Sequence, residues 1–596
     1  MLEWPGSPRA AQADRKAYLM NPTRQAPPSP SKWGRSCFST HRSSGAGASL
    51  ALSSGAKRGH ALARLGLSLL LCTALGLSGC NRARQPVTLP IPAVTQVPIP
   101  LPFVPADDSL FGYLRVRDPL ALLRALSSLS GGERLEALAL ARGWPLTDLK
   151  PGAGAALFVW DPAGQPLAAT PVAAVLPVAS SSALATRLHR AAGDGLVRGD
   201  GGGTLAALNP PGLARATAAG PALWQVAASQ DPADVLLYVN LAGLLDRYGA
   251  QARSALRAAS ALGLSGATPT PGQPSPKATM AMLERLLDRL NTVKATSLSL
   301  SLSPEAVELA TVVQERAGGT GGRGPVAAPD LTRLLPAAEV RLQWNARDLK
   351  RWVREYWEVY GALWSEQPAL QAQLKSTLDE WAQVTPQAEM AVAVTLRPQV
   401  RAYLISKVAD AGAALRVMRR AAASISSAGL QERYREQGLR ISVTVEPALR
   451  KLQGWPVDRY RYQVAVVDPG KVPAAARALF ERLNGATYEA MQLGPYLVAS
   501  FNDPLDVLAA DVVAGRGGGA LRARRVYPAG AVSYGDVDLE GLWAGVKALL
   551  PPEAGARLPA PPPHLGVATW FSYEGDQAAL YRVQLPRTLL GLLGAR

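Results

Sequence analysis

Leu298-Ser299-Leu300-Ser301-Leu302-Ser303 places an apolar and a polar side chain at alternate positions. A repeat of two residues is the period of a β-strand, in which successive side chains point to opposite faces of the sheet. The stretch therefore predicts a strand whose leucines are buried on one face. Helix patterns alternate with such strand patterns along the rest of the chain, so a mixed fold is expected.

An apolar hairpin is predicted on each side of this strand. Residues 155–160 face 172–176 across a turn that begins with Asp161-Pro162, and 390–394 face 401–405 across a second short turn. Strands joined by short turns pair antiparallel. Helices that follow such strands must cover a face of the sheet, which is typical of the α+β class.

The order of these patterns occurs twice: strand, helix, hairpin, helix, strand, strand, helix, hairpin. We therefore expect two tandem homologous lobes, each a curved antiparallel sheet covered by helices. The first lobe is expected over 105–315, the second over 331–596, and a Gly-rich linker over 316–330. Asp118 and Asn345 are predicted to cap the first helix of each lobe. Chance similarity between segments rich in Ala, Val and Leu is the alternative explanation.

The segment before the first lobe is rich in proline. Residues 80–104 hold six prolines between Pro86 and Pro102. This spacing favours polyproline II, a semi-rigid spacer that extends about 3.1 Å per residue. We expect a stalk between the folded part and whatever precedes it.

Leu77-Ser78-Gly79-Cys80 follows the apolar run 65–75 and the basic residues Lys57, Arg58 and Arg64. This order resembles the signal peptide and lipobox of bacterial lipoproteins, and the apolar run is too short to span a membrane. The resemblance implies a signal peptide over 57–79, cleavage between Gly79 and Cys80, and lipid attachment at Cys80. A short buried helix over the apolar run is the alternative interpretation.

The resemblance also implies a location. Asn81 follows the cysteine where, in such lipoproteins, an aspartate signals retention in the inner membrane, so we expect a cell-envelope protein anchored to the outer membrane and facing the periplasm. Residues 1–56 show no apolar period and are expected to be a disordered extension, or translation begins after Met1.

The amino-acid composition limits the classes of partner that we expect. The chain has 63 Lys+Arg and 45 Asp+Glu, a net charge of +18, and much of this excess precedes Cys80. No dense basic cluster carries interleaved aromatic residues, so we do not expect nucleic-acid binding. Of the three cysteines, Cys37 and Cys72 precede the expected cleavage site, which excludes disulfides within the mature chain.

The residues that usually carry chemistry are sparse. After Cys80 the histidines are His189 and His564, and His189 corresponds to Arg419 in the second copy. We find no serine-nucleophile elbow, phosphate loop or calcium loop, and we expect no metal, no cofactor and no catalytic residues. The neighbouring acids Asp506 and Asp511, and Asp536 and Asp538, are better explained by helix caps and solvated faces than by catalysis.

An unusual set of aromatic residues lies on the helix predicted over 347–364. Most are four residues apart and therefore share one stripe of that helix. Burial between the sheet and a neighbouring helix is one interpretation, and an exposed surface that binds a protein, glycan or lipid is the other. The set comprises Trp352, Tyr356, Trp357, Tyr360 and Trp364.

Two strand openings, Pro105-Ala106-Asp107 and Pro232-Ala233-Asp234, resemble those of a family of exported bacterial proteins of unknown function. This resemblance is limited to short motifs and implies no activity. The sequence therefore predicts a non-catalytic binding or scaffold protein, held on a membrane through acylated Cys80. The alternatives are a periplasmic carrier of a lipid or hydrophobic ligand, and a hydrolase with an unrecognised carboxylate site.

Overall fold

The computed structural model describes the folded body in segments. They are 99–130, 148–162, 170–178, 182–192, 196–198, 204–207, 209–261, 275–316, 327–346, 348–365, 367–472, 474–515, 528–550 and 564–589, with Leu89, Ile91, 555–556, 558 and 560–561 in addition. The expected extension 1–56, the signal peptide 57–79 and the attachment residue Cys80 lie outside the described residues. So does most of the Gly-rich linker.

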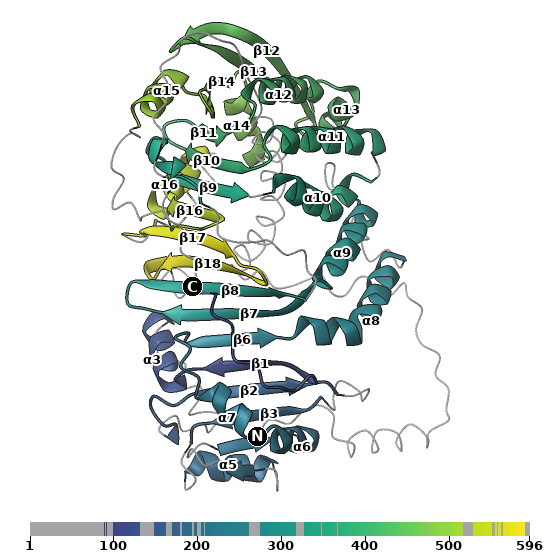
Figure 1. The fold of residues 1–596 in the computed structure, drawn as a ribbon, viewed down its shortest axis with the longest axis vertical. Helices are drawn as coiled ribbons and strands as arrows, with labels where there is room; N and C mark the ends of the chain where they lie inside the picture. Colours follow the sequence, from purple (N-terminus) through teal and green to yellow (C-terminus); the bar gives the residue numbers. More distant parts are fainter. Residues whose placement is uncertain are drawn as a thin grey trace, which may run out of the picture.

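The described strands form a single antiparallel sheet of eighteen strands, stacked along the long axis of the molecule (Figure 1). The pairings give the order from one edge to the other. It is β4 (Leu196–Arg198), β5 (Thr204–Ala207), β3 (Val172–Leu176), β2 (Ala155–Trp160), β1 (Leu110–Val116), β6 (Val235–Val239), β7 (Val293–Leu302), β8 (Ala306–Glu315), β18 (Ala578–Pro586), β17 (Val567–Glu574), β16 (Ser533–Asp538), β9 (Val340–Ala346), β10 (Ala388–Thr395), β11 (Arg401–Lys407), β15 (Tyr496–Phe501), β14 (Thr487–Leu493), β13 (Trp455–Val466) and β12 (Leu439–Leu452).

The expected α+β class is confirmed, and so are the two hairpins, β2–β3 and β10–β11. The expectation of a separate sheet in each lobe is wrong. β8 and β18 would be the exposed edges of two such sheets, and instead they pair with each other from Ala306–Pro586 to Gln314–Ala578. Pairing satisfies the backbone groups that an open edge would leave without partners.

Helices cover parts of both faces of the sheet. α8, α9, α10, α11 and α12 each pack on the next and form a continuous row along one side (Figure 1). The described helices are α3 (Pro119–Ser130), α5 (Ala183–Ala192), α6 (Pro210–Ala219), α7 (Pro221–Ala227), α8 (Leu241–Ala261), α9 (Pro276–Leu290), α10 (Leu349–Tyr360), α11 (Pro368–Val384), α12 (Ala411–Ile425), α13 (Ala428–Glu436), α14 (Ala474–Leu483), α15 (Leu505–Ala514) and α16 (Leu539–Leu549), with short 3₁₀ turns η5 (Leu331–Leu334) and η6 (Gly361–Trp364).

One of the two predicted helix caps is confirmed. The Asp118 carboxylate accepts a hydrogen bond from the Ala121 backbone N–H at 2.9 Å, at the start of α3. The other prediction is wrong, because Asp348 caps α10. Asn345 lies three residues earlier, buried in β9, where its side chain donates to the Ala531 carbonyl.

Two faces of the sheet can be followed from strand to strand. Tyr113, Tyr238 and Ser297 are in register on one face, which we call the tyrosine face, and their neighbours Leu114, Leu237 and Leu298 define the opposite leucine face. α7 packs on the tyrosine face of the first half, over a core that includes Phe158, Trp160, Leu223 and Val226. η5 and α15 cover the same face in the second half, and α12 covers the leucine face there.

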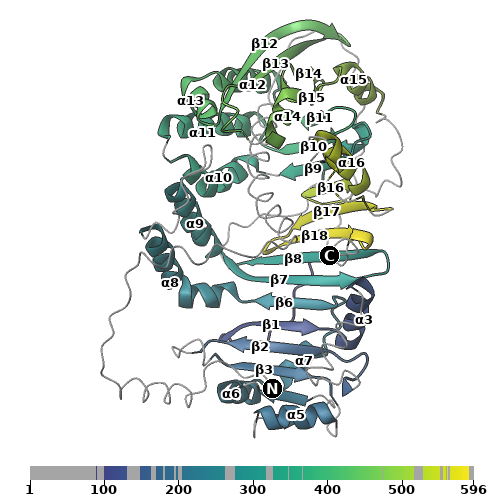
Figure 2. The same cartoon turned by 180° about the vertical axis from the view of Figure 1, so that it is seen from behind.

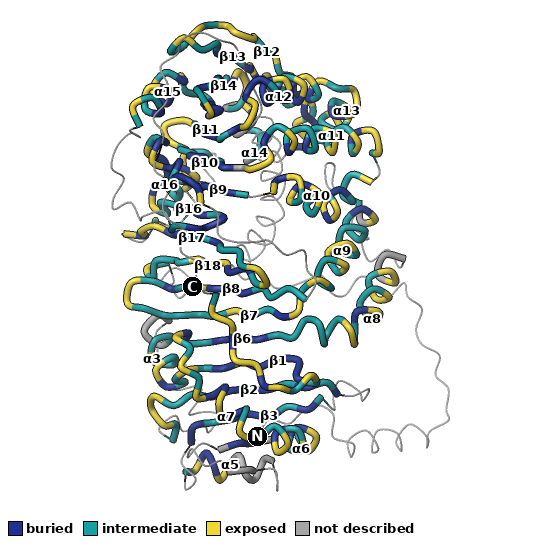
Figure 3. The backbone as a smooth tube through the Cα atoms, in the orientation of Figure 1, coloured by how far each residue is buried: buried dark blue, intermediate teal, exposed yellow. Residues whose placement is uncertain are grey.

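The serine–leucine strand is β7, as predicted, but its leucines do not form a buried face. Ser297 is 5% exposed on the tyrosine face, whereas Leu298 is 45% exposed. The expectation that the leucines form the buried face is therefore wrong at Leu298. Figure 2 shows β6, β7 and β8 with no described helix across them, and in Figure 3 these strands are coloured mostly as intermediate.

The proline-rich segment contacts the folded body at the residues that are described. Leu89 is buried in an apolar cluster that also contains Leu331, Leu334 and side chains of α15, and Ile99 packs on β8 and β18. The Tyr113 hydroxyl donates to the Phe103 carbonyl at 2.7 Å. At these points the segment lies on the tyrosine face, so it is part of the fold rather than a spacer that stands away from it.

Candidate functional site

An exposed apolar strip crosses the middle of the sheet on its leucine face. Its residues lie on five adjacent strands, from β1 to β18, and each is between 36% and 47% exposed. They are Leu114, Leu237, Leu298, Leu309, Tyr581 and Val583. Neighbouring strands are about 4.8 Å apart, so the strip is about 20 Å wide.

Strand register makes the strip continuous. Leu114 pairs with Leu237, which pairs with Leu298, and in the adjacent row Leu309 pairs with Val583. Soluble proteins rarely expose a contiguous apolar patch unless it contacts a partner, a ligand or a membrane. The strip is therefore the strongest candidate for a binding surface in the described part of the chain.

The strip continues toward the second half through Trp570. This residue pairs with Val583 on one side and with Gly535 on the other. A Cβ atom at Gly535 would lie 1.9 Å from the Trp570 ring, so glycine at this position lets the indole lie across β16. Trp344 follows on β9, opposite Ser533.

Part of the predicted aromatic stripe begins where this row ends. Trp344 packs on Trp352 with ring centroids 4.9 Å apart, Trp352 stacks on Tyr356 at 5.2 Å, and Tyr356 stacks on Tyr360 at 4.7 Å. Trp352 and Tyr360 are each 43% exposed. These four residues form an aromatic ladder that joins the sheet face to α10.

The other two aromatic residues of the stripe are not in the ladder. Trp357 packs with Leu349 and Val353 in a small core, and its ring lies over Gly361. The α-helix ends at Tyr360, earlier than predicted, and Trp364 falls in the 3₁₀ turn that follows. There its ring meets the Arg433 guanidinium at 5.0 Å. The stripe is thus part buried and part exposed.

The geometry of the ladder favours some ligands over others. Sugars bind to the open faces of aromatic rings, but here the faces of Trp352, Tyr356 and Tyr360 stack on one another. The edges of these rings remain available for contact with apolar groups. The arrangement therefore favours a hydrophobic partner over a glycan.

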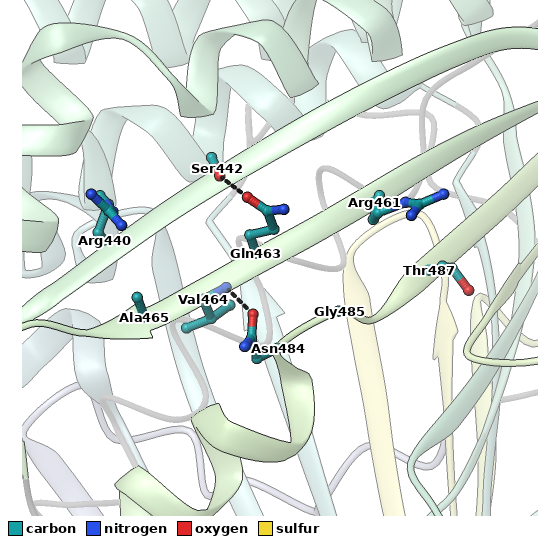
Figure 4. Close-up of a pocket in the computed structure, with 9 residues that line it drawn as sticks. All are labelled: Arg440, Ser442, Arg461, Gln463, Val464, Ala465, Asn484, Gly485 and Thr487. Carbon is teal, nitrogen blue, oxygen red and sulfur yellow. Dashed lines mark hydrogen bonds between the residues drawn. The ribbon is translucent and has the colours of Figure 1, made fainter.

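A pocket of about 520 Å³ opens on β12 and β13, at the far edge of the sheet (Figure 4). Two arginines and several neutral polar groups line it, and Arg461 pairs with Glu446 at 3.4 Å. Because the lining residues include no carboxylate, the pocket does not supply the paired acids of a hydrolase. The polar lining comprises Arg440, Ser442, Arg461, Gln463, Asn484 and Thr487.

The four acids singled out in the sequence all make interactions within the fold. Asp506 accepts two hydrogen bonds from Arg450, and Asp536 accepts two from the buried Arg341. Asp538 caps α16. The fourth, Asp511, lies in α15. Within the described residues no three His, Cys, Asp or Glu side chains gather as a metal site would require.

Among the described residues, His564 is not part of a cluster of potential metal ligands. His564 is exposed before β17, where its backbone carbonyl accepts a hydrogen bond from Thr588. The side chain of His189 lies outside what the structure describes. None of the described helices has the length and apolarity required to cross a membrane.

An ion-pair network beside β12 is expected to make the free energy of unfolding depend on pH. Burial would raise the pKa of Glu489, but hydrogen bonds from Arg450 and Arg459 outweigh it, and the pKa is lowered. The hydrogen bonds from Arg450 lower the pKa of Asp506 as well. A carboxylate whose pKa falls on folding stabilises the protein above its unfolded pKa and loses that contribution as the pH falls through the folded value.

We therefore expect the free energy of unfolding to fall as the pH drops below about 4, the ordinary range of carboxyl groups. Arg450→Met should flatten this dependence, because Asp506 loses the cation that lowers its pKa and Glu489 loses one of its two. Urea denaturation of the two proteins between pH 3 and pH 6 measures it. An equal slope in wild type and variant would contradict the prediction.

The chain was compared with protein-family models, with curated proteins and with solved structures, and it has no significant match in any of the three. The function must therefore be inferred from the residues and their geometry.

Proposed function

We propose that this chain is a lipid-anchored cell-envelope protein that binds another protein, without catalysis, on the apolar strip of its leucine face. The observation that carries the proposal is the exposed leucine face at the centre of the sheet, which is clearest on β7. This strand buries Ser297 and exposes Leu298, an arrangement that is unfavourable in water unless an apolar partner covers the leucine.

A protein partner fits the strip better than a carried lipid does. Carriers enclose most of the surface of a small ligand in a concave cavity. The strip is an open face about 20 Å wide, and the pocket on β12 and β13 is lined largely by polar groups. An open apolar surface flanked by an aromatic ladder is typical of protein interfaces.

The anchor is part of the proposal because of Leu77-Ser78-Gly79-Cys80, which resembles a lipobox. Cleavage before Cys80 and acylation of its thiol would place the protein on a membrane of the cell envelope. The expected outer-membrane location follows from Asn81, by the same resemblance.

We further propose that the two halves of the sheet arose by duplication. The order β5-β3-β2-β1-β6-β7-β8 has the same connectivity as β15-β11-β10-β9-β16-β17-β18. Asn240-Leu241-Ala242-Gly243-Leu244 and Asp538-Leu539-Glu540-Gly541-Leu542 start corresponding helices. In both, the first side chain accepts a hydrogen bond from the glycine N–H, at 3.0 and 3.1 Å.

Site-specific photo-crosslinking in native membranes tests the binding surface. A photoreactive residue at Tyr581 should give a discrete protein adduct, and one at Val546 should not. Val546 is a matched control, because it is 40% exposed on α16 and is not one of the residues of the strip. The double substitution Leu237→Asp and Leu298→Asp should reduce the Tyr581 adduct about tenfold or more, since it places charges at the centre of the apolar contact.

The adduct also distinguishes the alternatives. A Tyr581 adduct with the mass of a lipid would replace the protein-binding proposal with the carrier. Equal adducts at Tyr581 and Val546, or adducts that survive both aspartates, would show that the strip is not a binding surface.

A further inference from the structure

The contact at Leu89 limits how far the folded body can lie from the proposed anchor. Cys80 precedes Leu89 by nine residues. A fully extended chain spans at most about 3.6 Å per residue, so Cys80 lies within about 32 Å of Leu89. The distance is much shorter than a stalk over all of 80–104 would allow.

Leu89 belongs to one end of the elongated body. It packs in the same cluster as Leu505 and Leu508 of α15, and Leu452 and Trp455 at the tip of the β12–β13 hairpin pack against that cluster. Figure 1 places α15 and β12 at the end opposite β3 and α5. The chain therefore enters the body in the apolar cluster that reaches this end, and the proposed anchor at Cys80 lies within reach of it.

Two large apolar side chains are exposed at the same end. Leu449 on β12 is 44% exposed, and Val507 on α15 is 63% exposed. Their sequence neighbours Arg450 and Asp506 form an ion pair at 2.6 Å, which holds the two segments together. Lys451, also exposed, follows on the hairpin.

We infer that this end, with Leu449 and Val507, rests on the membrane surface that holds the acyl chains, an inference that depends on the proposed anchor at Cys80. Apolar side chains beside a cation suit the boundary between headgroups and acyl chains. The partner is therefore a phospholipid surface. Contact there would fix the orientation of a body that the acyl chains alone leave able to rotate.

This orientation places the apolar strip away from the bilayer. β18 lies nine strand positions from β12. At about 4.8 Å per strand, the strip begins about 40 Å from that edge of the sheet. The surface proposed for a protein partner would then face the aqueous compartment instead of its own membrane.

The cysteine content permits a direct test. Cys37 and Cys72 precede the cleavage site, and acylation blocks the Cys80 thiol, so an introduced cysteine would be the sole reactive thiol of the mature protein. Leu449→Cys, Val507→Cys and the control Leu286→Cys, on α9, are purified from membranes with their acyl chains. Leu286 is 39% exposed, which matches Leu449. Each is labelled with a fluorescent maleimide and reconstituted into vesicles that contain nitroxide-labelled lipid.

Labels at 449 and 507 should be quenched about threefold or more strongly than the label at 286, since groups at such a boundary lie about 5–10 Å into the bilayer surface. Equal quenching at the three positions would overturn the inference and leave the anchor intact. A reactive Cys80 thiol in the purified wild type would instead refute the anchor, and this inference with it, because the reach is measured from Cys80.

Discussion

Arg419→Met is expected to lower the free energy of unfolding by about 3–5 kcal/mol. The Arg419 guanidinium donates two hydrogen bonds to Asp458, at 2.8 and 3.1 Å. Asp458 is fully buried beneath α12, so the substitution leaves a buried carboxylate without the cation that pairs with it. The hydrogen bond to Asp458 raises the pKa of Arg419, as expected for a cation that this pair stabilises.

The next residue of α12 supplies the matched control. Arg420 pairs with Glu380, but its side chain is 62% exposed. Solvent screens such a pair, so Arg420→Met should cost about 0.5 kcal/mol or less. Urea denaturation followed by tryptophan fluorescence measures both variants. If the two neighbours cost the same, Arg419 does not stabilise a buried charge.

The two arginines show what the sequence could not predict. In the sequence both lie in a helix rich in Ala and Arg, and Arg419 corresponds to His189 in the first copy, with no sign of a buried partner. Asp458 lies 39 residues later, in a hairpin that no repeated pattern indicated. Only the pairing of β13 with β12 and β14, and the packing of α12 on β12, brings the two groups together.

The serine–leucine strand is a second case in which the sequence pattern was not sufficient to predict the structure. Its alternation correctly predicts that β7 is a strand and that its leucines share a face. The alternation does not indicate which face is covered, because that depends on where segments distant in sequence pack. Here Ile99 and the aromatic core lie on the tyrosine face, and Leu298 on the opposite face is left exposed.

The aromatic residues of the stripe could be predicted as one set, but the sequence did not indicate which of them are buried and which are exposed. A spacing of four residues correctly placed Trp352, Tyr356 and Tyr360 along one line. The end of the α-helix at Tyr360 then turned Trp364 toward Arg433. Little in the sequence predicts that the helix ends here. Gly361 does not adopt the left-handed conformation that is usual for a glycine after a helix, and the chain continues into a 3₁₀ turn.

The second large effect is expected at Trp160, whose substitution by alanine should lower the free energy of unfolding by about 3–5 kcal/mol. The indole is fully buried in the core of the first half and packs on Phe158 with ring centroids 5.9 Å apart. Its Nε1–H donates to the Asp107 carboxylate at 2.8 Å. Alanine would leave a cavity and remove that hydrogen bond, which holds the chain just before β1.

Trp352→Ala is the control that separates burial from residue type. Trp352 lies in the aromatic ladder and is 43% exposed, so its loss should cost about 1 kcal/mol or less. Trp160→Phe keeps most of the buried volume and should cost about 1–3 kcal/mol, part of it from the Asp107 carboxylate left without its donor. Urea denaturation of the three variants should rank Trp160→Ala as the least stable and Trp352→Ala as the most stable. The reverse order would mean that the ladder is a core of the body, and the proposed partner would then lose the aromatic end of its binding surface.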